Sequence, residues 1–255
     1  MQTVIPKTSA ALTSLLRADF KTQWRNRRSV VLLLLVPVII LISWKGLIAK
    51  VGGAFVLSTC ITIGLTAIGL MGYSNAIARD RDKGVFQRLR VTPVPTWSIM
   101  GSRLIVQLIL ILIVTTAVFV VGSEFDEVNL TPAGYALTYL TAFVGGALYL
   151  SLGQMIVGLV KNAETVNSTT RLVYFVFIMV GMLGDVLLIG NNSKSAKDFA
   201  NIIRWSPYGT VKAILAASMQ PSNWSNDTSL ALLASIGYAV AFSYLGIKNF
   251  RWNSQ

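Results

Sequence analysis

Histidine is absent from this chain of 255 residues, and cysteine occurs once, as Cys60. A lone cysteine cannot form an intrachain disulfide, and without histidine a Ser–His nucleophile pair is impossible. No group of cysteines and carboxylates has the spacing of metal ligands, so no metal site is expected. The G-x-x-x-x-G-K-[ST] phosphate loop is missing too, because no glycine is followed by lysine. We therefore expect no catalytic residues, and the chain cannot hydrolyse ATP by itself.

Charge is also scarce. Charged residues make up 13% of the chain and hydrophobic residues 54%, whereas soluble domains carry about 25% charged residues. The remaining charge is one-sided, with 22 Lys and Arg against 10 Asp and Glu, a net charge of +12. A basic excess indicates either nucleic acid or an anionic membrane surface as the partner. The apolar content favours membrane lipid, and we expect no nucleic-acid partner.

Long charge-free runs indicate membrane-spanning helices, since about 20 apolar residues cross the hydrocarbon layer. The pattern predicts an all-α, polytopic membrane protein with one transmembrane domain over residues 1–255. Its fourth span should begin at Thr131-Pro132, a helix cap followed by a first-turn proline. The six predicted spans cover residues 30–44, 51–78, 104–123, 132–160, 172–190 and 228–247.

The distribution of Lys and Arg predicts the orientation of these spans. The N-terminal segment, the loops after the second and fourth spans, and the C-terminal segment together hold most of the basic residues. The intervening segments are close to neutral. Because basic residues concentrate on the cytoplasmic side of membrane proteins, we expect both termini to be cytoplasmic.

Two segments outside the spans have helical patterns. Residues 9–28 predict an amphipathic helix lying in the inner headgroup region, although topology-setting charge alone would also explain its basic residues. Asp19 and Arg27 break the amphipathic pattern. Residues 197–220 predict a short outer helical pair, the second helix starting at Ser206-Pro207. This pair either dips into the membrane as re-entrant helices or lies flat on it.

The inner segment 79–103 carries the most specific pattern. A charged block directly follows the second span, and residues 84–90 then predict a short helix that ends before Thr92-Pro93. A short helix held at the cytoplasmic surface suits docking of a soluble partner, with apolar residues entering a groove and charges fixing the register. A solvated basic loop that only sets topology is the alternative.

The run Asp80-Arg81-Asp82-Lys83-Gly84, with Leu89 and Thr92-Pro93 after it, resembles the motif of ABC transporter permeases of the type-2 exporter class. That class includes the drug-resistance and natural-product export permeases of bacteria. This chain has Asp where Glu is usual, and Phe86 and Gln87 are less typical. The resemblance implies a coupling helix that docks on a separate ATPase, made of Asp80, Arg81, Asp82, Lys83, Gly84, Val85, Phe86, Arg88, Leu89, Arg90, Thr92 and Pro93.

The resemblance further implies two copies of a cytoplasmic ABC ATPase, which bind ATP and Mg, while this chain binds no cofactor. It implies a second permease chain, in a homo- or heterodimer, in the bacterial plasma membrane. The cargo would be an amphipathic drug, antibiotic or natural product moving outward. Facing second and fifth spans would line its path, with candidate residues Thr59, Thr62, Thr66, Asn75, Tyr174, Phe175, Phe177, Met179 and Met182.

Three alternatives remain open from the sequence. The cargo could be a lipid-linked polysaccharide precursor. The chain could be an ATP-independent secondary transporter, for which Asp185 is the one candidate ion-binding residue in a span. Its place near the outer end favours a vestibule or capping role instead. A membrane-anchored scaffold without transport is the third.

Overall fold

The computed structural model describes residues 8–25, 27–90, 96–126, 128–190 and 193–250. Every regular element in these ranges is a helix, which confirms the all-α prediction. Five helices are long and apolar enough to span a membrane, and the pair α1–α2, bent by 61°, would supply a sixth. The helices are α1 (Thr8–Arg25), α2 (Arg27–Ser43), α3 (Lys45–Val51), α4 (Gly53–Thr66), η1 (Ala67–Tyr73), α5 (Ser74–Asp82), α6 (Val85–Arg90), α7 (Thr96–Asp126), α8 (Pro132–Leu159), α9 (Ala163–Gly190), α10 (Lys194–Arg204), α11 (Pro207–Met219), η2 (Pro221–Asn223) and α12 (Asn226–Asn249).

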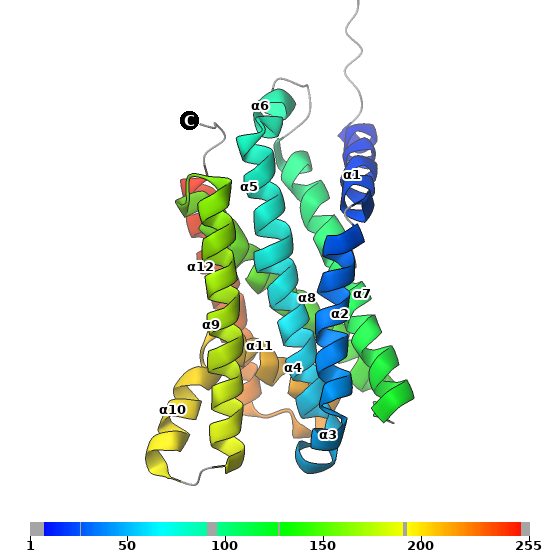
Figure 1. Ribbon diagram of the computed structural model, residues 1–255, viewed down its shortest axis with the longest axis vertical. Helices are drawn as coiled ribbons and strands as arrows, with labels where there is room; N and C mark the ends of the chain where they lie inside the picture. Colours follow the sequence, from blue (N-terminus) through cyan, green and yellow to red (C-terminus); the bar gives the residue numbers. More distant parts are fainter. Residues whose placement is uncertain (1–7, 26, 91–95, 127, 191–192, 251–255) are drawn as a thin grey trace, which may run out of the picture.

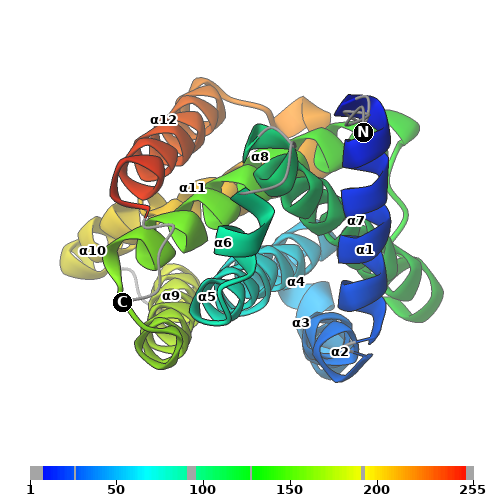
Figure 2. The same ribbon diagram turned by 90° about the horizontal axis from the view of Figure 1, so that it is seen from above.

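The second span is the core of the bundle. The elements α4, η1 and α5 form one continuous helix, Gly53–Asp82, whose apolar window is 83% buried, against 22% for α9 and 17% for α12. Figure 2 shows α5 near the middle, with α2, α9 and α12 at the periphery. Helices α2, α7, α8 and α9 all contact this central helix. Any force applied to its end therefore reaches most of the bundle.

The middle of the central helix, η1, is wound as a π-helix and crosses α8 at very short range. A Cβ at Gly69 would lie 2.5 Å from the Tyr149 backbone, and one at Gly153 would lie 2.5 Å from the Gly69 oxygen. Only glycine permits backbones to approach so closely. Both the N–H and the hydroxyl of Ser74 donate to the Gly69 oxygen, a five-residue spacing that defines the π turn. Small residues thus let the second and fourth spans pack closely at this crossing.

Figure 1 shows that the bundle has two distinct ends, which we call the α6 end and the α10 end. Helix α1 lies at the α6 end, and α3 lies with α10 at the opposite end. The outer helical pair is present as α10 and α11, separated by the Ser206 cap, whose hydroxyl accepts from the Gly209 N–H at 3.1 Å. Helix α11 is largely buried and packs against α4, α8 and α12, while α10 packs on the outside of α9.

Several helices extend further than the sequence predicted. The third predicted span, 104–123, is the centre of a helix from Thr96 to Asp126, and the fifth begins at Ala163 rather than 172. The second continues through the charged block to Asp82, and the outer pair begins at Lys194. A hydropathy window ends at the first cluster of charges, but a helix can continue through the headgroup region with charged ends.

Candidate functional site at the α6 end

The charged block occupies the last turn of a helix rather than a loop. Helix α5 continues through Asp80, Arg81 and Asp82. The helix ends at Asp82, and Gly84, two residues later, has a φ of +66°, the left-handed conformation that glycine readily adopts. The Gly84 N–H donates to the Arg81 carbonyl at 3.0 Å, and the chain then turns into α6. The short helix predicted for this segment is therefore present, at residues 85–90.

The turn at Gly84 predicts the effect of a substitution. A Cβ there would meet only Gln87 Oε1, at 3.4 Å, so the penalty comes from backbone conformation. We expect Gly84→Ala to lower the free energy of unfolding by about 1–2 kcal/mol. Gly84→Asn is the matched control and should have a smaller effect, because asparagine tolerates this conformation. Equal losses in the two variants would contradict this explanation. Denaturant unfolding of the purified protein in detergent measures both.

Arg81 joins α5 to the end of α8. Its side chain is 2% exposed, and its guanidinium donates to the carbonyls of Val157 (2.7 Å), Val160 (3.0 Å) and Lys161 (2.6 Å). The last carbonyls of a helix have no partner within the helix, and a cation there also interacts favourably with the helix dipole. Arg81 therefore caps the C-terminus of the fourth span.

Asp82, the next residue, joins α5 to the start of α9. Its carboxylate accepts a hydrogen bond from the Ala163 N–H at 2.9 Å, at the first residue of that helix. Beside it, Asn162 caps α9 by accepting from the Thr165 N–H at 2.7 Å. A negative charge at a helix N-terminus is stabilising. Consecutive residues of the motif thus hold the end of one span and the beginning of the next.

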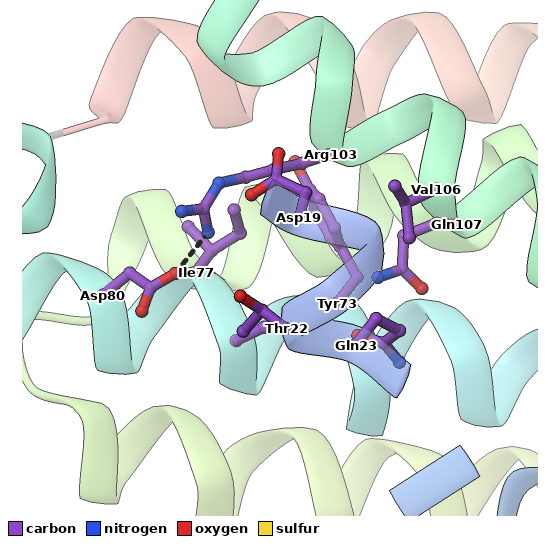
Figure 3. Close-up of a pocket in the computed structure, with 10 residues that line it drawn as sticks. Asp19, Thr22, Gln23, Tyr73, Ile77, Asp80, Arg103, Val106 and Gln107 are labelled. Carbon is purple, nitrogen blue, oxygen red and sulfur yellow. Dashed lines mark hydrogen bonds and ion pairs between the residues drawn. The ribbon is translucent and has the colours of Figure 1, made fainter. Parts of the chain in front are cut away.

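Asp80 joins α5 to α7. Its carboxylate pairs with Arg103 at 2.5 Å, as Figure 3 shows. The Arg103 guanidinium also lies 4.9 Å from the centre of the Phe86 ring, in a cation–π contact. The Phe86 ring is fully buried and packs edge-on to Phe250 at 5.8 Å. The sequence interpretation placed Phe86 on a face that enters a partner, but the structure places it inside the permease, where it anchors α6.

The exposed surface of α6 and of the turn before it is polar. Lys83, Gln87 and Arg88 are exposed, whereas Val85 and Leu89 are partly buried. Docking by this surface stays a prediction.

Three further residues of the predicted docking set cannot be placed in full. Thr92 and Pro93 lie outside the described residues, and for Arg90 the structure describes the backbone, within α6.

Helix α1 contacts the same region through Asp19. The Ser102 hydroxyl, in α7, donates to the Asp19 carboxylate at 2.5 Å. Burial raises the pKa of the Asp19 carboxyl above its usual value, while the Ser102 bond and the Arg103 charge act in the opposite direction. The residue that broke the amphipathic pattern of α1 therefore points into the bundle.

The threonines proposed to line a substrate path are buried in the core. Thr59, Thr62 and Thr66 have no exposed surface. Each hydroxyl donates to the carbonyl four residues earlier in its own helix, at 2.7–2.9 Å. The Asn75 amide does the same with Met71 at 2.9 Å. Threonine in a spanning helix can satisfy its hydroxyl this way, so its presence does not by itself indicate a polar path.

The candidate path residues of α9 point in different directions. Phe175 and Met179 are about 60% exposed, at 59% and 61%, whereas Tyr174 is 7% exposed. Phe177 and Met182 are partly buried. Within one chain the structure does not bring the α4 and α9 candidates together around one opening, and the path stays a prediction.

An ion pair at the α10 end was missed by the sequence interpretation. Asp185, in α9, and Lys212, in α11, pair at 2.5 Å with side chains 16% and 10% exposed. The Lys212 ammonium also lies 3.7 Å from the centre of the Phe55 ring, in α4. Asp185 lies within α9 and pairs with a side chain, so it does not cap this helix, while a vestibule role stays a prediction. Two opposite charges in apolar surroundings were the available signal, but their separation in sequence concealed the pairing.

The geometry at the α6 end links a short surface helix to several spans. Residues 10–183, more than half of the chain, match the family described as "ABC-2 type transporter". The chain therefore belongs to this family, and it is a multi-pass membrane protein and a transport subunit rather than an enzyme itself. Membership implies an ABC ATPase as a partner in general.

A curated relative agrees with this assignment. The chain is 21% identical, over 170 residues, to a protein of Bacillus subtilis (strain 168) named "Putative transport permease YvfS". The alignment covers 64% of this chain and 69% of the relative.

Proposed function

We propose that this chain is the membrane subunit of an ATP-driven exporter, moving an amphipathic drug, antibiotic or natural product out of a bacterial cell. The α6 end faces the cytoplasm, together with both termini, and two copies of an ABC ATPase dock there. The observation that carries the proposal is the connection of Asp80, Arg81 and Asp82 to α7, α8 and α9. Movement of α6 by a partner would shift three spans through these contacts.

A second permease chain completes the transporter in this proposal. The apolar face of α9 is uncovered in one chain, with Leu172 at 65%, Phe175 at 59% and Met179 at 61% exposure. Such a face contacts either lipid or another spanning helix. Aromatic and methionine side chains are large and adaptable, which suits an amphipathic cargo passing between two chains.

The docking surface can be tested with two exposed charges, Lys83 in the turn before α6 and Arg88 in α6. We expect Lys83→Glu together with Arg88→Glu to weaken binding of the ATPase roughly tenfold, because exposed charges at a docking surface control partner encounter and register. Both positions are exposed, so the fold should be retained. The measurement is co-purification of the ATPase with tagged permease, together with ATP-dependent transport in vesicles.

The matched control changes the same number of charges at the opposite end. Lys45 and Lys50 are exposed in α3, at the α10 end, and replacing both by glutamate should leave ATPase binding unchanged. Loss of binding in the control alone would place the docking surface at the α10 end. Full binding and transport in both double variants would overturn the docking role of α6.

A further inference from the structure

A small cavity lies where α1 crosses the bundle at the α6 end. It has a volume of about 50 Å³ and is bounded by α1, by the central helix around Tyr73 and α5, and by α7. Figure 3 shows Asp19, Gln23, Asp80 and Gln107 around it. One water molecule needs roughly 10–15 Å³ of such space. The cavity therefore has room for a small headgroup of a few atoms, and not for an extended cargo molecule.

The charges on the cavity wall do not balance. Two carboxylates, Asp19 and Asp80, face a single guanidinium, Arg103, which leaves one negative charge in excess. Arg103 is already paired with Asp80 at 2.5 Å. Asp19 accepts one hydrogen bond from Ser102, and burial raises its pKa above the usual value. The carboxylate of Asp19 is thus poorly compensated, and a cation beside it would be stabilised.

An unsatisfied amide lies on the same wall. Gln107 is 4% exposed, it lines the cavity, and its Oε1 has no hydrogen-bond partner among the described residues. A buried polar group without a partner is unfavourable and indicates a missing ligand or water. A group with several N–H donors could satisfy Gln107 and Asp19 together, and an ammonium carries three donors.

Asp19 is also exceptional within its own helix. The other charged residues of α1 are the basic residues Arg17, Lys21 and Arg25, which are exposed, whereas Asp19 is partly buried toward α7. An acidic residue there weakens attraction of α1 to anionic lipid, so it does not serve the basic surface of the helix. We propose that this cavity binds a primary ammonium group, held by the Asp19 carboxylate with Asp80 and the Gln107 amide beside it.

Two sources could supply the ammonium. If α1 lies at the headgroup level, an inner-leaflet lipid with an ethanolamine headgroup reaches the cavity directly. A soluble amine is the other source. Because the cavity is lined by the motif residue Asp80 and by its ion-pair partner Arg103, in α7, its ligand would stabilise the contact between α1, α5 and α7. The inference concerns the permease alone and does not depend on the proposed ATPase docking.

The experiment compares two lipids with the same acyl chains, phosphatidylethanolamine and phosphatidylcholine, on the purified permease by native mass spectrometry. Methylation of the amine removes its N–H donors and leaves the phosphate unchanged. We expect phosphatidylethanolamine to be retained about tenfold better, the difference expected for the loss of a charge-assisted hydrogen bond. Asp19→Asn should abolish the preference, because asparagine keeps an acceptor for Ser102 and loses the charge. Glu164→Gln removes an exposed charge on α9 and should keep it.

Free ethylamine distinguishes the two sources. If it raises the melting temperature of the wild-type protein and displaces the lipid, the ligand is a soluble amine. If phosphatidylethanolamine is retained better than phosphatidylcholine and ethylamine has no effect, the ligand is the lipid headgroup. Equal retention of the two lipids by wild-type protein, with no response to ethylamine, would overturn the proposal. A preference that survives in Asp19→Asn would also overturn it, and the wild-type comparisons stand even if that variant does not fold.

Discussion

Arg81→Lys should largely uncouple the transporter: we expect ATP hydrolysis by the bound partner to continue while transport falls about tenfold or more. The Arg81 guanidinium makes three hydrogen bonds, of 2.6–3.0 Å, to the end of α8. A lysine ammonium is a compact point charge and cannot reproduce this planar fork. Each lost hydrogen bond to a charged group is worth about 1.5–3 kcal/mol. The substitution should therefore loosen α5 from α8, without touching the exposed surface of α6.

The measurement pairs vesicle transport with ATPase activity in the reconstituted complex. Arg79→Lys is the matched control, since Arg79 lies on the same helix, is exposed, and among the described residues donates to the Asn75 carbonyl of its own helix, at 3.2 Å. It should change unfolding free energy by no more than about 0.5 kcal/mol. If Arg81→Lys transports at the wild-type rate, force is not transmitted through this contact. If it also loses ATPase binding, Arg81 supports the docking surface instead.

The spans were predictable from the sequence, but the ends of the helices were not. Hydrophobic runs located all five long helices and α2, because burial in lipid requires about 20 apolar residues whatever the tertiary contacts. The extension of α5 to Asp82 depends on acceptors at the end of α8, namely the backbone carbonyls that bind Arg81. Backbone carbonyls have no sequence signature, so the block looked like a charged loop.

In the candidate site, too, the sequence predicted a feature that depends on neighbouring residues and missed features that depend on contacts distant in sequence. The helix at residues 85–90 depends on local chemistry, and the sequence predicted it over residues 84–90. The turn at Gly84 was not predicted, because the sequence interpretation placed Gly84 inside that helix. The burial of Phe86 depends on Arg103 and Phe250, which are distant in sequence. The threonines of α4 were expected to be polar lining, but their hydroxyls are satisfied by their own helix. Asp19 was visible only as a break in a pattern.

The ion pair at the α10 end predicts the largest effect on stability. We expect Asp185→Asn to lower the free energy of unfolding by about 3–5 kcal/mol, because it leaves the Lys212 ammonium buried without its counter-ion. The two side chains are only 16% and 10% exposed, and the ring of Phe55 alone cannot replace a carboxylate. Denaturant unfolding in detergent measures the effect.

A second ion pair in the same region serves as the control. Arg204 and Asp227 pair at 3.4 Å with side chains 43% and 58% exposed. Asp227→Asn removes the same charge and should change stability by about 0–1 kcal/mol, as is usual for solvated pairs. Equal small effects of Asp185→Asn and Asp227→Asn would mean that the Asp185–Lys212 pair is hydrated and does not stabilise the contact between α9 and α11.

Replacing both partners separates structure from transport. Asp185→Leu with Lys212→Met should restore most of the lost stability, because apolar replacement of a buried pair is often neutral or stabilising. The non-additivity of the single variants Asp185→Leu and Lys212→Met relative to the double variant then gives the coupling energy between α9 and α11. An ATP-driven permease with this neutral pair should still transport, since neither charge carries a driving ion. A secondary transporter that used Asp185 to bind its ion would lose all transport in the stable double variant. That result would show that an ion gradient, and not ATP hydrolysis, drives transport.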